Sequence, residues 1–173
     1  MGVELYTVRP GTLADLPRIV EIYNHYILHT PITFDVDPVT VEQRRSWLSE
    51  HSTAGRYRLF VAEASGAVVG YAGSRQFRPR AAYECTVETG VYCDPSWTGR
   101  GAGTALYRVL FEALLDEDIE SYIAGVTLPN DASVELHARF GFQHVGTMQR
   151  VGRKFGAYWD VGWYQAPHDA KTR

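Results

Sequence analysis

The sequence is poor in the residues that mark secreted and metal-binding proteins. It holds only two cysteines, Cys85 and Cys93. Eight residues of extended chain would place them roughly 26 Å apart, beyond the reach of a disulfide. No Cys-x-x-Cys pair is present, and we expect no metal site. Both cysteines are therefore predicted to be small core residues of a protein in a reducing, cytoplasmic compartment.

The sequence also lacks an excess of basic residues and a long apolar run. Its net charge of −3 offers no attraction to nucleic acid or to an anionic membrane. No apolar run approaches the length of a membrane span, and the first residues lack the basic-then-apolar pattern of a signal segment. We therefore expect no nucleic-acid partner and no membrane. The 173 residues suffice for one globular domain whose core needs no disulfides.

What the sequence does contain is a glycine-rich turn, residues 97–106 (WTGRGAGTAL), between a β-like segment and a helix. The β-like segment covers 84–93, and apolar residues recur at helical spacing from Leu106 to Leu114. Such a turn directs free backbone N–H groups and the positive end of the helix dipole toward one point. Glycine also lets a phosphate approach the backbone closely. The turn predicts an anion site suited to a pyrophosphate.

Three phosphate-binding loops compete for this turn, with a plain tight turn as the alternative. A Walker A loop needs a lysine, and none is near. A dinucleotide fingerprint fails because Thr104 or Leu106 occupies its last position in either frame. The third pattern, Arg/Gln-x-x-Gly-x-Gly/Ala, is matched by Arg100, Gly103 and Ala105. This pattern resembles the acetyl-CoA loop of the Gcn5-related N-acetyltransferases (GNAT).

The rest of the chain predicts a mixed α/β domain. Strands are expected at 5–9, 57–64, 68–74, 83–93 (the longest), 122–128, 143–151 and 157–165. Helices are expected from Thr12 or Asp15, from Thr40 to about Glu50, after the glycine turn to about Asp116, and from Asn130 to about Gly141. Residues 24–35 are predicted as a loop and 75–80 as a basic connector. Residues 1–165 would form the single domain, followed by a polar tail, 166–173.

The predicted order, β-α-α-β-β-β-α-β-α-β-β, is similar to that of the GNAT fold, a mostly antiparallel mixed sheet with helices on both faces. Scattered segments also resemble the phosphinothricin N-acetyltransferase family. These segments are Asn24-His25-Tyr26-Ile27, Ala82-Tyr83, Thr86-Val87-Glu88, Leu128-Pro129-Asn130-Asp131, Ser133-Val134 with Leu136-His137, and Asp160-Val161-Gly162. The resemblance implies an acetyl-CoA-dependent N-acetyltransferase, often a homodimer, that acts on the α-amine of a small amino-acid-like compound.

Glu88 is the candidate general base. Period-two alternation places it with Glu84, Thr86 and Tyr92 on the strand face opposite Val87 and Val91. A carboxylate in mid-strand is costly unless it is paired or solvated, so Glu88 is either functional or a structural carboxylate paired with a buried arginine. The resemblance favours function, because Glu88 stands at the family's proposed base position.

The resemblance also assigns other site residues. His137 would protonate the leaving thiolate, with a surface or satisfied core histidine as the alternative. Phe34, Arg78, Arg80 and Tyr83 would bind the substrate. The arginine cluster of Arg75, Arg78 and Arg80 can bind its carboxylate, with a solvated basic turn as the alternative. The cofactor would contact Val91, Tyr92, Cys93, Gly99, Arg100, Gly101, Ala102, Gly103, Thr104, Ala105, Asn130 and Ser133. The alternative functions are acetylation of a protein N-terminus or a general amine, and a non-catalytic acyl-CoA sensor.

Overall fold

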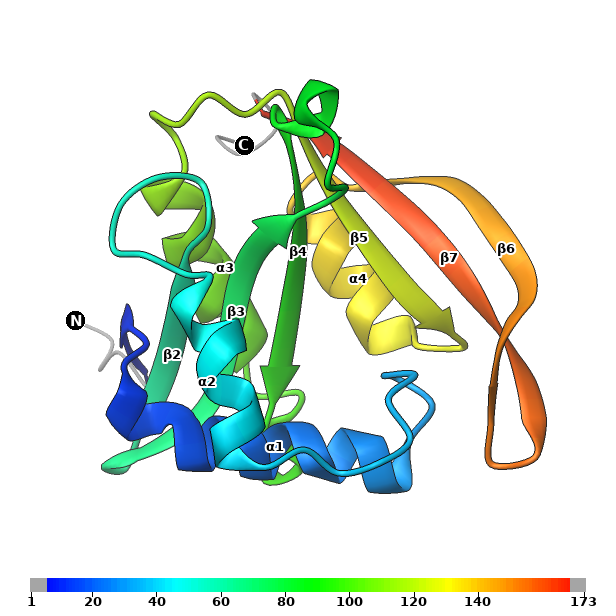
Figure 1. The fold of residues 1–173 in the computed structure, drawn as a ribbon, viewed down its shortest axis with the longest axis horizontal. Helices are drawn as coiled ribbons and strands as arrows, with labels where there is room; N and C mark the ends of the chain where they lie inside the picture. Colours follow the sequence, from blue (N-terminus) through cyan, green and yellow to red (C-terminus); the bar gives the residue numbers. More distant parts are fainter. Residues whose placement is uncertain (1–5, 169–173) are drawn as a thin grey trace.

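A computed structural model of the chain describes residues 6–168 and contains one seven-stranded mixed sheet with helices on both faces (Figure 1). The strands are β1 (Thr7–Pro10), β2 (Leu59–Ala64), β3 (Ala67–Gln76), β4 (Thr86–Cys93), β5 (Ser121–Leu128), β6 (Gln143–Lys154) and β7 (Ala157–Pro167). The α-helices are α1 (Leu16–His29), α2 (Val41–Ser49), α3 (Ala102–Ala113) and α4 (Asp131–Arg139), with 3-10 turns η1 (Leu13–Asp15), η2 (Ala81–Tyr83) and η3 (Pro95–Trp97). The predicted order of strands and α-helices is confirmed.

The sheet has the strand order β1-β2-β3-β4-β5-β7-β6, and every neighbouring pair is antiparallel except β4 and β5. Apolar residues of α1 cover one face, where they pack on β2 and β3: Ile19, Ile22 and Ile27 against Leu59, Val61, Val68 and Tyr71. Apolar residues of α3 cover the other face: Leu106, Tyr107 and Leu110 against Phe60, Val69, Val87 and Tyr122. The sheet therefore has a buried core on each side.

The parallel pair in the middle of the sheet is short. β4 and β5 pair only over Thr86–Glu88 and Ser121–Ile123. Beyond these residues β4 keeps its partner β3 and β5 keeps its partner β7, so the two strands diverge toward their C-terminal ends (Figure 1). The divergence leaves two strand edges that face each other without a ladder of hydrogen bonds.

Local signals in the sequence account for several element boundaries. The side-chain oxygen of Thr40 accepts a hydrogen bond from Gln43 N at 3.2 Å, and Gln43 Oε1 accepts one from Thr40 N at 2.8 Å, which is the predicted capping box of α2. Asn130 caps α4, since its Oδ1 accepts from Ser133 N at 3.2 Å. The β2–β3 turn runs through Ser65 and Gly66, both with positive φ (52° and 79°), as a tight hairpin requires.

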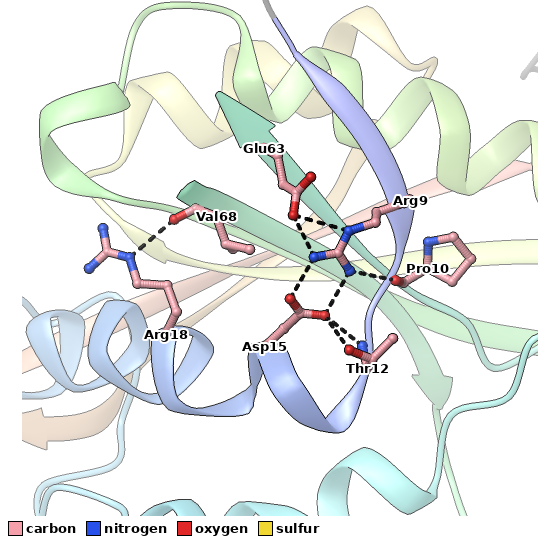
Figure 2. A network of polar contacts seen from close by, with 7 residues as sticks. All are labelled: Arg9, Pro10, Thr12, Asp15, Arg18, Glu63 and Val68. Carbon is pink, nitrogen blue, oxygen red and sulfur yellow. Dashed lines mark hydrogen bonds and ion pairs between the residues drawn. The ribbon is translucent and has the colours of Figure 1, made fainter. Parts of the chain in front are cut away.

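An ion-pair network attaches the first strand to the rest of the domain (Figure 2). The Arg9 guanidinium donates to Asp15 Oδ1 at 2.7 Å and to Glu63 Oε1 at 2.5 Å. Asp15 Oδ2 also accepts from Thr12 N at 2.8 Å. The hydrogen bond from Arg9 lowers the pKa of the Asp15 carboxyl below its usual value. One buried carboxylate thus joins β1, η1 and, through Arg9, β2.

Helix α1 is longer than predicted. The loop expected over 24–35 begins only after His29, because Tyr26 and Ile27 continue the buried face of the helix. The Tyr26 hydroxyl donates to Cys93 O at 2.6 Å, which fixes this last turn against the end of β4. Tertiary packing therefore extends the helix past the point where its sequence periodicity weakens.

Strand β4 is shorter than predicted and is not the longest. It has 8 residues, whereas β6 has 12. Tyr83 N donates to Arg80 O at 2.9 Å, so the preceding residues form the 3-10 turn η2, and Glu84 lies ahead of the strand. Arg75, predicted in a connector, belongs to β3 instead.

The two ends of the predicted domain also differ from the structure. Strand β7 continues through Pro167, because Ala166 pairs with Tyr122 and is 2% exposed, so the predicted tail does not begin at 166. Leu5 of the predicted first strand and residues 169–173 of the predicted tail lie outside the described residues. Among the helices of residues 6–168, none is long and apolar enough to cross a membrane.

Candidate active site

Two cavities adjoin where β4 and β5 diverge. The larger, about 510 Å³, is lined by the end of β4, the glycine turn and α4. The smaller, about 410 Å³, is lined by the loop after α1, by α2, and by β3 and β4. Six residues line both: Ile32, Thr89, Gly90, Tyr92, Gly125 and Thr127. A molecule in one cavity can therefore reach a molecule in the other through the gap between the two strands.

The glycine turn forms one wall of the larger cavity. Gly99 and Gly101 have φ of 71° and 93°, and Gly101 is the N-cap of α3. This left-handed conformation is open to glycine at little cost, and it aims the first N–H groups of α3 outward. Gly103 has an ordinary helical conformation, and a Cβ there would lie 3.0 Å from Leu136 Cδ2. The turn has the geometry of an anion site.

Most of the predicted cofactor residues line this cavity. They are Val91, Tyr92, Cys93, Gly99, Gly101, Ala102, Gly103, Thr104, Asn130 and Ser133. Arg100 and Ala105 do not line it. Arg100 is exposed, and its guanidinium carbon lies 5.2 Å from the centre of the Trp97 ring. From Gly99 to Thr104 the cavity wall is thus made of backbone and small side chains, and Arg100 does not line it.

Cys93 lies in the wall of the larger cavity as a free thiol. Burial raises the pKa of this thiol to about 11. A thiol with that pKa is protonated near neutral pH and is a poor nucleophile. Its position is therefore consistent with a packing role, as predicted.

His137 lines the larger cavity and is 3% exposed. Its Nδ1 lies 2.7 Å from the Ser133 carbonyl oxygen, and a carbonyl only accepts, so Nδ1 carries the proton. Nε2 then accepts from the Tyr107 hydroxyl at 2.9 Å. Burial lowers the pKa of His137 below its usual value. The imidazole is neutral at pH 7 and can act as an acid only after Nε2 gains a proton.

Glu88 lines the smaller cavity, and its side chain is 17% exposed. Its Oε1 accepts a hydrogen bond from Arg75 Nη2 at 2.6 Å, across the ladder between β3 and β4. Val87 is buried in the core on the opposite face, so the predicted alternation is confirmed. The partner arginine is 59% exposed, unlike the buried arginine of the structural alternative. The ion pair holds the carboxylate in the cavity wall.

Phe34, predicted to contact substrate, lines the smaller cavity from the loop after α1. The β6–β7 hairpin supports this loop. A Cβ on Gly152 would lie 2.2 Å from the Phe34 ring, so glycine makes room for it. The buried Lys154 donates to Thr33 O at 2.8 Å. Residues more than 100 positions apart in the chain thus build one wall together.

The structure does not bring the other predicted substrate residues into the cavity. Arg78 and Arg80 lie between β3 and η2, Tyr83 lies in η2, and none of them lines either cavity. Tyr83 is 41% exposed and meets Phe77 edge to face, with ring centres 5.7 Å apart. Phe77 in turn contacts Trp163, which does line the smaller cavity. This segment therefore lies behind the cavity wall.

Sequence reasoning missed several residues of the smaller cavity: Tyr23, Asp35, Arg44, Trp47, His51, Tyr71 and Trp163. Arg75 was predicted in the arginine cluster and does line this cavity. Arg44 and Trp47 are three residues apart on α2, one face of a helix, and His51 follows four residues later, just after the helix ends, which was a signal in the sequence. Another unused signal is the pair His25 and His29, one turn apart on α1 with ring centres 4.9 Å apart. Among the described residues no third potential metal ligand joins them.

Comparisons with known proteins agree with this geometry. A model of the Acetyltransferase (GNAT) family matches residues 19–142. Phosphinothricin N-acetyltransferase of Streptomyces coelicolor is 53% identical over 168 residues, which cover 96% of this chain and 98% of that protein. L-methionine sulfoximine/L-methionine sulfone acetyltransferase of Pseudomonas aeruginosa is 33% identical over 159 residues, 92% of each chain. The structure of yncA from Salmonella typhimurium with its cofactor acetyl-CoA superposes with a TM-score of 0.90 at 34% identity, covering 95% of this chain and 94% of that one.

Proposed function

The chain belongs to the acetyltransferase (GNAT) family and uses acetyl-CoA as co-substrate, and from this premise we propose that it acetylates the α-amine of a small amino acid of the phosphinothricin or methionine sulfoximine type. One observation carries the proposal. A cavity with a glycine turn and a second cavity with a carboxylate meet at the gap between β4 and β5. The names of the two relatives support this choice of substrate.

The larger cavity suits acetyl-CoA, which supplies the acetyl thioester when it is bound. The backbone N–H groups at the start of α3, beside Gly101, suit its pyrophosphate. The edge of β4 from Thr89 to Cys93, which lacks a ladder partner on the β5 side, offers backbone groups to its amide-containing arm. Asn130 and Ser133 face the same cavity from α4. No side chain of this set needs to ionise for the cofactor to bind.

In this proposal Glu88 takes the proton from the substrate ammonium, directly or through a water molecule. An amine attacks a thioester only in its unprotonated form, so a carboxylate in the smaller cavity, directly before Thr89 and Gly90 of the shared wall, suits the role of base. His137 is the candidate acid for the departing thiolate. Its Nδ1 proton is engaged with Ser133, so this role requires a proton on Nε2, where the Tyr107 hydroxyl lies.

Transfer is proposed to be direct, without an acyl-enzyme intermediate. Cys93 is the thiol that lines the larger cavity, where it could carry an acyl group. Its pKa, raised to about 11, keeps it in the thiol form at neutral pH. The alternatives are acetylation of a protein N-terminus or of amines in general, and a non-catalytic acyl-CoA sensor. The sensor is disfavoured because Glu88 and His137 both face the joined cavities.

Two further features belong to the proposal, a homodimer and a cytoplasmic location. Strand β6 is the edge of the sheet, and large apolar side chains on β6 and β7 are exposed: Val145, Met148, Val151 and Tyr158. An apolar, unpaired edge of this kind suits contact with a second copy. The two free thiols suit a reducing compartment. Sedimentation velocity at micromolar concentration tests the dimer, and a monomer would reject it.

The test of the proposed function is an amine panel scored by thiol release from acetyl-CoA. We expect turnover of phosphinothricin or methionine sulfoximine, at least tenfold better in kcat/KM than turnover of the matched amine that lacks the α-carboxylate. The difference arises because a charge-assisted hydrogen bond is worth about 1.5–3 kcal/mol. Equal rates for the acid and its decarboxylated twin would favour the general-amine alternative. No thiol release with any amine or peptide would favour the sensor.

A further inference from the structure

The polar atoms without partners are concentrated in one place. Within residues 6–168, three buried side-chain nitrogen or oxygen atoms have no hydrogen-bond partner: Arg44 Nε, Thr89 Oγ1 and Trp163 Nε1. All three residues line the smaller cavity. A buried donor without a partner destabilises the fold, and few such atoms survive in native proteins. Arg44 Nε and Trp163 Nε1 can only donate, and their shared location indicates that a ligand of this cavity supplies the missing acceptors.

Arg44 is the unpaired cation of the cavity. Its guanidinium carbon lies 4.0 Å from the ring centre of Tyr23 and 4.9 Å from that of Trp47, so two aromatic rings fix its position. Within the described part of the chain, its side chain has no hydrogen bond and no ion pair. The other arginine of the cavity, Arg75, is paired with Glu88 at 2.6 Å. Arg44 is therefore the cation free to bind an anion.

The chemistry of these donors defines the ligand. Guanidinium and indole N–H groups only donate, so the ligand must present acceptor atoms to Arg44 and Trp163. The charge of Arg44 further calls for an anionic group, and a carboxylate matches its planar fork. Thr89 contributes less to this argument, because its hydroxyl also interacts with the Tyr107 hydroxyl. That interaction lowers the pKa of Tyr107, whereas burial raises it. Glu88, on the same cavity wall, suits the ammonium of a zwitterion.

We propose that Arg44 binds the α-carboxylate of the acceptor amino acid and that Trp163 Nε1 donates to a second acceptor atom of the same molecule. This inference rests on the proposed function and assigns its substrate specificity to α2 and β7. It moves the carboxylate contact away from Arg78 and Arg80, which lie outside the cavity wall. The substrate class that results is a zwitterion with an acceptor-rich, oxygen-bearing head.

The experiment compares three variants on one pair of substrates. The variants are Arg44→Gln, Arg80→Ala and the control Arg45→Gln, and the substrates are phosphinothricin and its decarboxylated amine. Arg45 is the next residue on α2 but is exposed and paired with Glu42. We expect Arg44→Gln to lower kcat/KM for the acid about 10- to 100-fold and to change that for the amine less than threefold. The KM for acetyl-CoA should stay near wild type in Arg44→Gln, and the control Arg45→Gln should match wild type on both substrates. Arg80→Ala should keep the preference for the acid over the amine.

Outcomes of this design separate the inference from the function on which it rests. If wild type acetylates the acid but Arg44→Gln does so equally well, or if Arg80→Ala alone erases the preference, the Arg44 assignment is wrong and the function stands. If wild type prefers the amine, the proposed function fails. Calorimetric titration of the acid into the CoA-bound protein then tests Arg44 independently of turnover. A Kd that is unchanged in Arg44→Gln rejects the Arg44 assignment, and a weaker Kd supports it. Arg44→Lys, which keeps the charge, should recover part of the loss.

Discussion

Glu88 is a single carboxylate on which the proposed chemistry depends, and Arg75 keeps it in place. Glu88→Gln preserves the shape of the side chain and removes the base. We expect turnover to fall about 10²–10⁴-fold, the usual range for a positioned acid–base group. The loss should shrink at high pH, where more of the substrate is already free amine. Thiol-release kinetics from pH 7 to pH 10 measure both effects.

The matched control for this prediction is Glu84→Gln. Glu84 is exposed and lies ahead of β4, so its loss removes the same charge from the same segment without touching either cavity. It should retain wild-type turnover. Wild-type turnover in Glu88→Gln as well would make Glu88 a structural partner of Arg75.

His137 makes the stability of the fold depend on pH. Burial lowers its pKa in the folded protein, so the unfolded chain binds more protons at this residue as the pH falls. The contribution of neutral His137 to the free energy of unfolding is fully present above about pH 6.5. It decreases as the pH falls from there through the lowered pKa of the folded protein. We expect wild type to lose more free energy of unfolding between pH 7.5 and pH 5.5 than His137→Gln does. Urea titrations at several pH values measure this.

Burial also lowers the pKa of His51, so some pH dependence should remain in His137→Gln. Identical slopes for wild type and His137→Gln would show that His137 titrates alike in the folded and unfolded chain.

The glycine turn before α3 is an element in which backbone strain and ligand binding can be separated. Gly101 and Gly66 both have positive φ, and at both a Cβ would meet nothing within 4 Å. An alanine at either position should cost about 1 kcal/mol of stability from backbone strain alone. Only Gly101→Ala should also raise the KM for acetyl-CoA severalfold, because it disturbs the N–H groups that face the larger cavity. Thermal melts and acetyl-CoA saturation curves test this, and an equal KM in both variants would remove the turn from cofactor binding.

The junction of β1, η1 and β2 is a second element with a measurable role. Asp15→Asn weakens both hydrogen bonds to Arg9 and should lower the free energy of unfolding by about 1–3 kcal/mol. Because the folded pKa of Asp15 is lowered, its contribution is present above about pH 3.9 and disappears as the pH falls through the lowered value. Glu21→Gln, which removes a 70% exposed partner of Arg18, should cost less than about 0.5 kcal/mol. Chemical denaturation at pH 7 and pH 3 measures the free energy of unfolding of both variants. Equal losses in Asp15→Asn and Glu21→Gln at pH 7 would mean that the burial of Asp15 adds no stability.

Across the whole molecule, the sequence was most informative where structure depends on neighbouring residues. The capping box at Thr40, the hairpin at Ser65-Gly66 and the helix after the glycine turn are local patterns, and each is confirmed. The order of the strands and α-helices followed from such patterns. The alternation around Glu88 was also correct, because period two holds wherever one strand face is buried.

The rest depended on contacts that a single chain segment does not reveal. The last turn of α1 is held by a hydrogen bond from Tyr26 to Cys93, 67 positions away. Arg78 and Arg80 stand in a basic segment but lie outside the cavity, whereas Arg44 reaches it because α2 packs beside Tyr23. Which arginine faces a site is decided by helix placement. Because Arg78, Arg80 and Tyr83 line neither cavity, their roles in substrate binding stay predictions.

The divergence of β4 and β5 also has a consequence for the motions of the protein. Beyond Glu88 and Ile123 the two strands no longer protect each other's amides from hydrogen exchange. The sheet therefore consists of two parts that are joined only by the short parallel pairing of β4 and β5. A cofactor arm lying in the gap would hydrogen-bond to the free edges of these strands, as an additional strand would, and would connect the two parts. Saturating CoA should then slow hydrogen exchange at those amides of residues 89–93 that point away from β3, and leave the β6–β7 turn unchanged. Exchange that slows equally everywhere would mean global stabilisation only. If the cofactor binds in this gap as proposed, it adds protection to the sheet on binding and removes it on release, once in each turnover.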